Sequence, residues 1–450
     1  MPMGTIRGQR GNPRRVVGTP TAGRPPAAPA SAASMGVATS AVSVASRTLA
    51  ASVVLVAAVV LAGCDPRTDP GTPTTTAPAS DGPSARPAVA VAPDLDGATA
   101  ANAVNDAGDM VISRAGPAGM EFYYLAPGTR PVPLTHEGAP IEPRLLNNAG
   151  QVVGLVTDPA GHEPPRLVRW QDGHSTVLPV HGDEVIPEDL NDRGQVTAIA
   201  ITRRSDAPGS DPATTARAYL TDETTAVDLG VAPDTNEHNL YLNEAGQVAG
   251  RAFVESGGTA HGFLWDDGEL TTFDTGATTH PVITGINDAG QVVGLVLDDQ
   301  DLPSGAQPIF RPAFRWTSGD LTMLDTRGAG AGPVRINRSG QVAGVVADPS
   351  GATRDVTLWS AEPDATPTRL GIPSPDYVVG INDGGDVLVA GTVGPTASPG
   401  GYLWHDGRLV TLGTLGGLAA DPKGLSAGGL VVGQSTSADN IWRAASWPAP

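Results

Sequence analysis

The segment "GINDAGQVVG", Gly285 to Gly294, places a turn-forming tetrapeptide between two short apolar runs. Asn-Asp-Ala-Gly is typical of a type I turn followed by a left-handed residue, because the Asn side chain caps the turn and Gly adopts a positive φ without strain. The flanking runs in this copy are "PVITGI" and "QVVGLVL". The segment therefore predicts two adjacent antiparallel strands, which we name strands A and B.

Copies of this turn recur along most of the chain. An eighth, degenerate copy has Ser426 in the Asn place and Gly429 in the Gly place. Successive anchors are 42, 44, 52, 44, 50, 45 and 44 residues apart. This is the period of one four-stranded β-propeller blade, whereas β-helix repeats are usually shorter. The Asn anchors are Asn105, Asn147, Asn191, Asn243, Asn287, Asn337 and Asn382.

Two further runs follow each pair of strands. A third strand, C, is exemplified by "HGFLW", and a fourth, D, by "ELTTF". Two versions of strand D, "RPVPL" and "TPTRL", contain Pro, which is tolerated chiefly on edge strands and places D outermost. Six of the seven Trp share one position of strand C, and this recurrence predicts packing between blades rather than a sugar-stacking ladder. These are Trp170, Trp265, Trp316, Trp359, Trp404 and Trp447.

The two ends of the repeat region predict a closed ring. The eighth repeat has strands A, B and C, but the chain reaches Pro450 before any strand D. The missing strand is supplied by the segment "RPAVA", Arg86 to Ala90, which resembles the strand D "RPVPL". Closure leaves no open blade interface, so we predict an all-β, eight-bladed propeller from about Arg86 to Trp447. Seven blades remain an alternative if the ring absorbs the degenerate copy.

The repeat resembles a known family. "INDAGQVVG", followed by "HGFLW" and "DDGELTTF", is similar to the HAF repeat family of extracellular bacterial repeat proteins, from Asn105 to Trp447. The family's His-Ala-Phe triplet is represented by His261-Gly262-Phe263. The resemblance implies an extracellular location and implies no particular reaction or ligand.

The N-terminal part is predicted to be an export leader. Residues 1–47 are of low complexity, and residues 48–62 form an apolar run of the length of a signal-peptide core. Leu61-Ala62-Gly63-Cys64 resembles a lipobox, which predicts acylation of Cys64 and a leader over residues 1–63. An uncleaved membrane anchor is the alternative, although the run is shorter than the roughly 20 residues that span a bilayer. The translation start could be Met1 or Met35.

After the leader, residues 64–85 form a tether rich in Pro and Thr, and residues 86–450 form the repeat domain. This order predicts an extracytoplasmic domain anchored to the cell membrane as a lipoprotein. Cys64 is the chain's single Cys, so no internal disulfide can form and the domain must be stable through packing alone.

Charge excludes one class of partner. The first 63 residues hold six Arg and no acid, so the rest of the chain has 28 − 6 = 22 basic and 47 acidic residues, a net charge of 22 − 47 = −25. Nucleic acid is therefore not an expected partner, because it requires clustered Lys and Arg. We expect a monomer.

Candidate binding residues lie in two long connections. The Asn-Gly and Asp-Gly turns crowd one face of the ring, so the variable B-to-C and D-to-A loops emerge on the other, where binding residues are frequent. The largest B-to-C loops are Arg203 to Thr214 and Asp298 to Pro308, although relaxed, solvated insertions would look the same. The candidate ligand-binding residues in them are Arg203, Arg204, Asp206, Asp211, Asp298, Asp299 and Asp301.

Cofactor signals are weak. The acids at 298–301, or Asp94 and Asp96, could supply oxygen ligands to calcium, but neither group has the full ligand spacing of a calcium loop. The eight His lack the spacing of a zinc site, so no metal site is predicted.

The sequence predicts a binding module rather than an enzyme. We find no phosphate-binding loop, and no catalytic residue is assigned. The expected partner is an extracellular protein or glycan. A propeller-type hydrolase or lyase that acts on glycans through carboxylates at the channel mouth is the alternative. The fold alone indicates no activity.

Overall fold

The computed structural model describes residues 85–449, apart from residues 118, 159, 205–212, 234–238, 254–259, 277–278, 299–310, 328–329, 349–352, 363–364 and 395–396. Chain contacts divide the protein into two units, Met1–Ala41 and Val42–Pro450, and every described residue belongs to the second. The described residues contain no helix long and apolar enough to cross a membrane.

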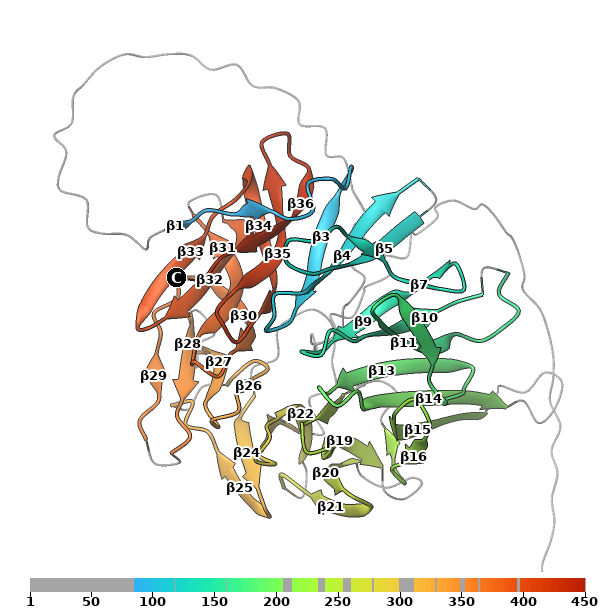
Figure 1. Cartoon of the computed structure of the whole chain (residues 1–450). Helices are drawn as coiled ribbons and strands as arrows, with labels where there is room; N and C mark the ends of the chain where they lie inside the picture. The colour runs from blue at the N-terminus through green and yellow to red at the C-terminus, as the bar shows by residue number, and fades with distance from the viewer. Residues whose placement is uncertain are drawn as a thin grey trace, which may run out of the picture. The chain divides into compact units, whose positions relative to one another are not determined.

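Eight antiparallel sheets form a ring, which confirms the predicted eight-bladed propeller (Figure 1). Within each sheet the strand order follows A, B, C, D. The A strands of neighbouring blades contact one another, while Figure 1 shows the D strands at the rim of the ring. Each blade is thus one copy of the repeat.

The first four blades begin after the closing strands. Their strands, in the order A to D, are β3 (Thr99–Val104), β4 (Met110–Gly116), β5 (Gly119–Leu125) and β6 (Val132–Pro133); β9 (Glu142–Leu146), β10 (Val152–Val156), β11 (Arg166–Gln171) and β12 (His174–Val177); β13 (Glu184–Leu190), β14 (Val196–Arg204), β15 (Ala213–Thr221) and β16 (Ala226–Asp228); and β18 (Leu240–Leu242), β19 (Val248–Phe253), β20 (Ala260–Asp266) and β21 (Glu269–Phe273). In blade 4, β17 (Ala232–Pro233) also pairs with β19, so strand A is split. A small hairpin of β7 (Thr135–His136) and β8 (Ala139–Pro140) connects blades 1 and 2.

The last four blades follow the same plan. Their strands are β22 (Thr279–Ile286), β23 (Val292–Asp298), β24 (Ala313–Thr317) and β25 (Asp320–Met323); β26 (Arg335–Ile336), β27 (Val342–Ala347), β28 (Arg354–Trp359) and β29 (Thr368–Arg369); β30 (Pro375–Ile381), β31 (Val387–Val393), β32 (Ser398–His405) and β33 (Arg408–Leu412); and β34 (Gly416–Leu425), β35 (Val431–Ser437), β36 (Trp442–Trp447) and β2 (Val89–Ala90).

The N-terminal strand completes the last blade, as predicted. In the β2–β36 pair, Val89 lies opposite Ser446, and the Val91 N–H donates to the Ala444 carbonyl at 2.9 Å. The pairing is shorter than the predicted Arg86 to Ala90. The preceding strand, β1 (Ala85–Arg86), instead runs parallel to β33 at the edge of blade 7. Residues 85–95, which we call the closing segment, therefore join two blades.

The Asn turn has the predicted geometry and a second role that was not predicted. Asn147 Oδ1 accepts the Gln151 N–H at 2.8 Å, and Gly150 has a φ of 73°. The Asn147 Nδ2 also donates to the Asn191 carbonyl of the next blade, at 2.8 Å. Equivalent bonds run from each Asn anchor to the following anchor, ending with Asn382 and the Ser426 carbonyl at 3.2 Å. The repeated motif therefore connects the blades around the hub.

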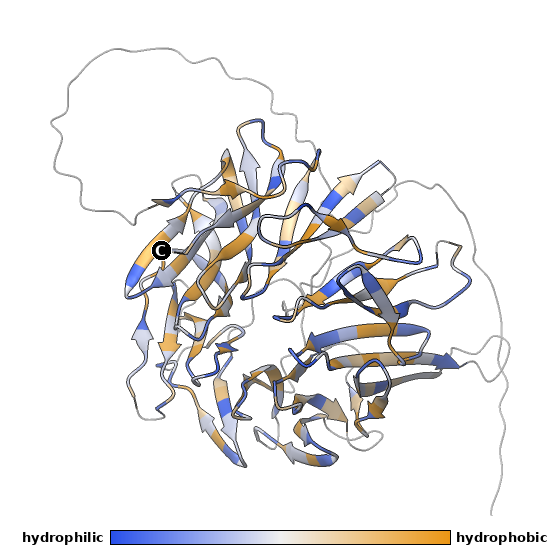
Figure 2. Cartoon of the chain, in the orientation of Figure 1, coloured by the Kyte–Doolittle hydropathy of each residue, from blue (hydrophilic) through white to orange (hydrophobic). Residues whose placement is uncertain are grey.

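The Trp residues pack between blades, as predicted. Five of the six are between 0% and 8% exposed, and Trp404 is half-buried. Each lies opposite the first residue of strand B, as Trp316 lies opposite Val292. The Trp316 ring stacks on Phe273 of the preceding blade, with centroids 4.8 Å apart. Figure 2 shows hydrophobic positions along the strands of the blades.

Candidate functional site at the seam between blades 8 and 1

Two neighbouring positions of strand C fill each blade interface. At each interface, the second of the two blades supplies the residue at the Trp position of its strand C. The first blade supplies the residue immediately before the corresponding position of its own strand C. Tyr124 and Trp170 form such a pair between blades 1 and 2, with ring centroids 5.1 Å apart. Leu403 and Trp447 share the core between blades 7 and 8. Most interfaces therefore contain an indole and a second large side chain.

The seam between blades 8 and 1 lacks both large side chains. Leu125 occupies the Trp position of blade 1, opposite Met110, and Ser446 precedes the Trp position of blade 8. Blade 3 also lacks the Trp and has Thr221 instead. There, however, Arg169 of blade 2 extends to the Gly194 carbonyl at 3.2 Å. The seam is thus the interface with the smallest pair of side chains.

A cavity of about 530 Å³ opens at this seam. Blade 1 contributes Met110 and Leu125, blade 8 contributes Leu430, and the closing segment contributes Val91. These four side chains are half-buried. The volume lies within the range of about 300 to 1,000 Å³ that is usual for ligand pockets, and apolar walls of this kind are usual in them.

Two carboxylates line the same cavity. Asp94 comes from the closing segment and Asp106 from the Asn turn of blade 1, and both are exposed. One oxygen of Asp106 accepts the Ala427 N–H of blade 8 at 2.6 Å. Among the described residues that line the cavity, none carries a positive charge. The seam pocket therefore combines apolar walls with acidic groups.

The Asp106 contact belongs to a second series of hydrogen bonds around the hub. Except at Arg338 and Ala427, whose side chains cannot accept, the residue after the anchor accepts a backbone N–H from the preceding blade, as Asp288 Oδ1 accepts from Glu244 at 2.9 Å. Burial raises the pKa of Glu244, and the neighbouring carboxylates of Asp192 and Asp288 raise it further, against the lowering effect of the Asp192 N–H bond. At the seam the anchor is Ser426, which has no side-chain amide to donate to blade 1. The bond from the Ala427 N–H to Asp106 connects blades 8 and 1 at the hub instead.

A buried carboxyl pair joins blades 3 and 4. Asp189 Oδ2 accepts the Leu242 N–H at 2.9 Å, and Glu188 is 3% exposed at a bulge of β13. Burial raises the pKa of Glu188 to about 8, and Asp189 adds to this, while a hydrogen bond from the Leu240 N–H opposes it. Glu188 is therefore mostly protonated at neutral pH. This burial could not be predicted from the sequence, because it depends on a bulge in the strand.

The structure corrects the boundaries of one predicted loop. Arg203 and Arg204 lie in β14, paired with Thr214 and Ala213, because the antiparallel pairing of β14 and β15 extends beyond the apolar segment. The Arg203 side chain forms an ion pair with Glu184 at 2.7 Å. Asp298 is the last residue of β23, and its backbone is opposite Thr279. The other predicted positions, Cys64, Asp206, Asp211, Asp299 and Asp301, lie outside the described residues.

The described residues contain no group of three or more His, Cys, Asp or Glu side chains that could hold a metal ion. Asp94 and Asp96 are both exposed, and Asp94 lines the seam pocket while Asp96 does not. Calcium at Asp298, Asp299 and Asp301 stays a prediction, because Asp299 and Asp301 lie outside the described part of the chain.

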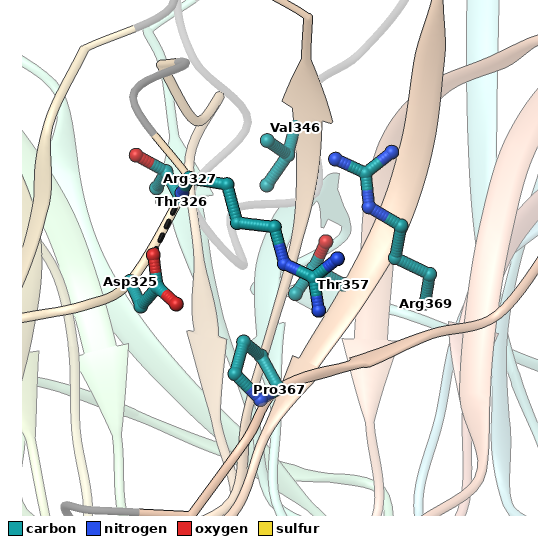
Figure 3. Close-up of a pocket in the computed structure, with 7 residues that line it drawn as sticks. All are labelled: Asp325, Thr326, Arg327, Val346, Thr357, Pro367 and Arg369. Atoms are coloured by element: carbon teal, nitrogen blue, oxygen red, sulfur yellow. Dashed lines mark hydrogen bonds between the residues drawn. The ribbon is translucent and has the colours of Figure 1, made fainter.

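A shallow groove lies between blades 5 and 6 (Figure 3). Arg327 and Arg369 line it together with Thr357, and the Arg327 N–H donates to Asp325 Oδ1 at 2.8 Å. The groove encloses essentially no volume (≈ 0 Å³). We therefore regard the seam pocket as the candidate ligand site.

No protein-family model and no curated protein matches the chain. Solved propeller structures are similar in fold. The β-propeller domain of the Trilobed protease from Pyrococcus furiosus is 10% identical, with a TM-score of 0.45, over 70% of this chain and 98% of that one. The acylaminoacyl peptidase of Pyrococcus horikoshii is 11% identical, with a TM-score of 0.45, over 71% of this chain and 52% of that one. A puromycin-hydrolyzing peptidase of Mycobacterium tuberculosis is 13% identical, with a TM-score of 0.46, over 79% of this chain and 61% of that one.

The chain thus matches about half of the length of the Pyrococcus horikoshii enzyme. At these identities the likeness concerns the propeller fold alone, and we base no activity on it.

Proposed function

We propose that the protein is an extracytoplasmic binding module, held at the cell membrane by an acylated Cys64, whose ring carries a ligand in the seam pocket. The observation that supports binding most directly is the cavity of about 530 Å³ at the blade interface with the smallest side chains. The large apolar side chains that line the cavity are half-buried, so part of their surface is in contact with water. A ligand that covers them would remove this apolar surface from water.

The proposed location rests on the sequence. The apolar run at 48–62, the lipobox at 61–64 and the Pro-rich tether are ordered as in an exported lipoprotein. The resemblance to the HAF repeat family supports an extracellular role. A closed ring joined by hub hydrogen bonds is a suitable architecture for a domain that cannot form an internal disulfide.

We also propose a second binding surface, on the face of the ring opposite to the Asn-Gly and Asp-Gly turns. The variable B-to-C loops, with Arg203 and Arg204 at the end of β14, emerge there. An exposed ion pair between Arg203 and Glu184 holds one of these side chains near its own blade. An extracellular protein or glycan is the partner that such loops would contact.

A glycan hydrolase or lyase is less well supported. On the loop face His261 Nδ1 lies 2.6 Å from Asp274 Oδ1, with side chains 34% and 55% exposed. Glycoside hydrolysis usually requires two carboxyl groups on either side of the scissile bond. This pair supplies one carboxyl group, so we favour the binding function.

Ligand-observed NMR of the full-length protein tests the proposal. A library of small apolar fragments is compared on the wild type and on Leu125→Trp, which places an indole where six other blades have one. We expect fragments that bind the wild type to lose binding to Leu125→Trp. Equal binding to both proteins would show that the seam pocket is not the ligand site.

A further inference from the structure

We propose that the seam pocket selects a ligand with a primary ammonium group on an apolar body. This inference rests on the proposed function, because it specifies the ligand of the same site. The pocket has one kind of charge: among its described lining residues, the ionisable side chains are Asp94 and Asp106. An apolar ligand with a carboxylate or phosphate would meet repulsion here, while a cation would be attracted.

The two carboxylates come from opposite sides of the seam. Asp94 lies within a tight turn of the closing segment, where the Leu95 N–H donates to the Ala92 carbonyl at 3.0 Å and Ala92 has a φ of 50°. Asp106 is fixed in the hub by the Ala427 N–H at 2.6 Å. Because an ionised carboxylate accepts several hydrogen bonds, Asp106 keeps acceptor capacity for a ligand.

The chemistry of the lining selects the type of cation. Carboxylates bind N–H donors through short, charge-assisted hydrogen bonds, which a primary ammonium can supply three times over. A quaternary ammonium has no such donor and is usually held by aromatic faces. Among the described residues that line the pocket, none is aromatic. The lining therefore favours a primary over a quaternary ammonium.

The apolar part of the ligand has a defined place. Met110, Leu125 and Leu430 form the walls at the level where other interfaces contain an indole. A hydrocarbon chain or ring that replaces the missing indole removes these half-buried side chains from water. The net charge of −25 beyond residue 63, from 22 basic and 47 acidic residues, attracts cations to the same surface.

Isothermal titration of the full-length protein tests this inference with three matched probes: hexylammonium, 1-hexanol and hexanoate. We expect hexylammonium to bind at least about ten-fold more tightly than hexanol, and hexanoate to bind more weakly than either. Asp94→Asn and Asp106→Asn should each weaken hexylammonium binding about three- to ten-fold and change hexanol binding less than about two-fold.

Asp96→Asn is the matched control, because Asp96 is exposed two residues from Asp94 and does not line the pocket. It should leave the binding of all three probes unchanged. Leu125→Trp should abolish the binding of hexylammonium and hexanol together.

Two results would overturn the inference in distinguishable ways. Equal affinity for hexylammonium and hexanol, insensitive to Asp94→Asn and Asp106→Asn but lost in Leu125→Trp, would refute the cation preference and leave the binding function in place. Failure of every probe to bind the wild type, or binding that persists in Leu125→Trp, would refute the seam pocket itself.

Discussion

Leu125 lies opposite Met110 in blade 1, where six other blades place a Trp opposite a Val. This single pair distinguishes the seam from the other interfaces. Leu125 stands in place of this Trp in the blade next to the point at which the N-terminal segment pairs with β36 and closes the ring. The ring is therefore least filled where its two ends meet, and the candidate site follows from that coincidence.

Removing an in-register indole should destabilise the ring. Trp316→Leu deletes the stacking on Phe273 and leaves a cavity, so we expect a loss of about 2 to 4 kcal/mol in the free energy of unfolding. Trp442→Leu is the control, because Trp442 is out of register and half-buried, and it should lose about 1 kcal/mol or less. Urea unfolding followed by fluorescence measures both. Similar losses for the two variants would contradict the packing of the in-register Trp residues between blades.

The reverse change should stabilise the seam. Leu125→Trp adds an indole beside Met110 and Leu430 in the cavity of about 530 Å³ and buries more apolar surface there, so we expect the free energy of unfolding to rise by about 1 kcal/mol or more. Thermal unfolding measures the change against wild type. A decrease as large as that of Trp316→Leu would mean that the seam is already fully packed.

Two adjacent asparagines provide a matched test of the hub. Asn147→Ala removes the turn cap and the bond to the Asn191 carbonyl, in a side chain that is 4% exposed. We expect it to cost about 2 to 4 kcal/mol. Asn148→Ala removes the exposed hydrogen bond from the Asp106 N–H of the preceding blade instead, and should cost about 1 kcal/mol or less. Equal costs in urea unfolding would show that the buried anchor bonds contribute no more than the exposed ones.

Glu188 should make stability depend on pH. Its pKa is raised to about 8 in the folded protein from an ordinary value of 4.5, so the folded state retains a proton that the unfolded state releases between these values. Stability must therefore fall as pH rises from about 5 to 8, by up to several kcal/mol from this group.

Glu188→Gln tests that dependence, because an amide oxygen can still accept the Leu240 N–H without ionising. We expect the variant to match wild type near pH 5 and to be more stable near pH 8. Glu184→Gln, an exposed residue of the same strand, is the control and should leave the slope unchanged. A wild-type slope in Glu188→Gln would refute the assignment.

The membrane anchor has its own test. Cys64→Ser removes the predicted acylation site, so radiolabelled palmitate should be incorporated into the wild type and not into the variant. The variant should move from the membrane to the soluble fraction. Membrane retention of unlabelled Cys64→Ser would instead support the uncleaved apolar segment at 48–62 as the anchor.

The sequence predicted the fold because the turn chemistry is local. Asn147 and Gly150 specify a turn within four residues, and the repetition of that turn indicates the blade count. The Trp positions and the closing strand followed from the same period. The bond from Asn147 to Asn191 was not predicted, since it joins residues 44 positions apart across a blade boundary.

The seam pocket could not be predicted in the same way. It depends on Leu125 of blade 1 and Leu430 of blade 8, each ordinary in its own blade, being placed at one interface by ring closure. The available signal was the absence of Trp from strand C of blade 1, where Leu125 takes its place. The predicted loop at 203–214 was too long because Arg203 and Arg204 continue the pairing of β14.

A crystal structure of the full-length protein soaked with hexylammonium tests the central claim most directly. We predict the alkyl chain between Met110, Leu125 and Leu430, with the ammonium nitrogen within hydrogen-bonding distance of Asp94 or Asp106. A seam in which Leu125 packs directly against Leu430, with no space and no ligand, would contradict the account.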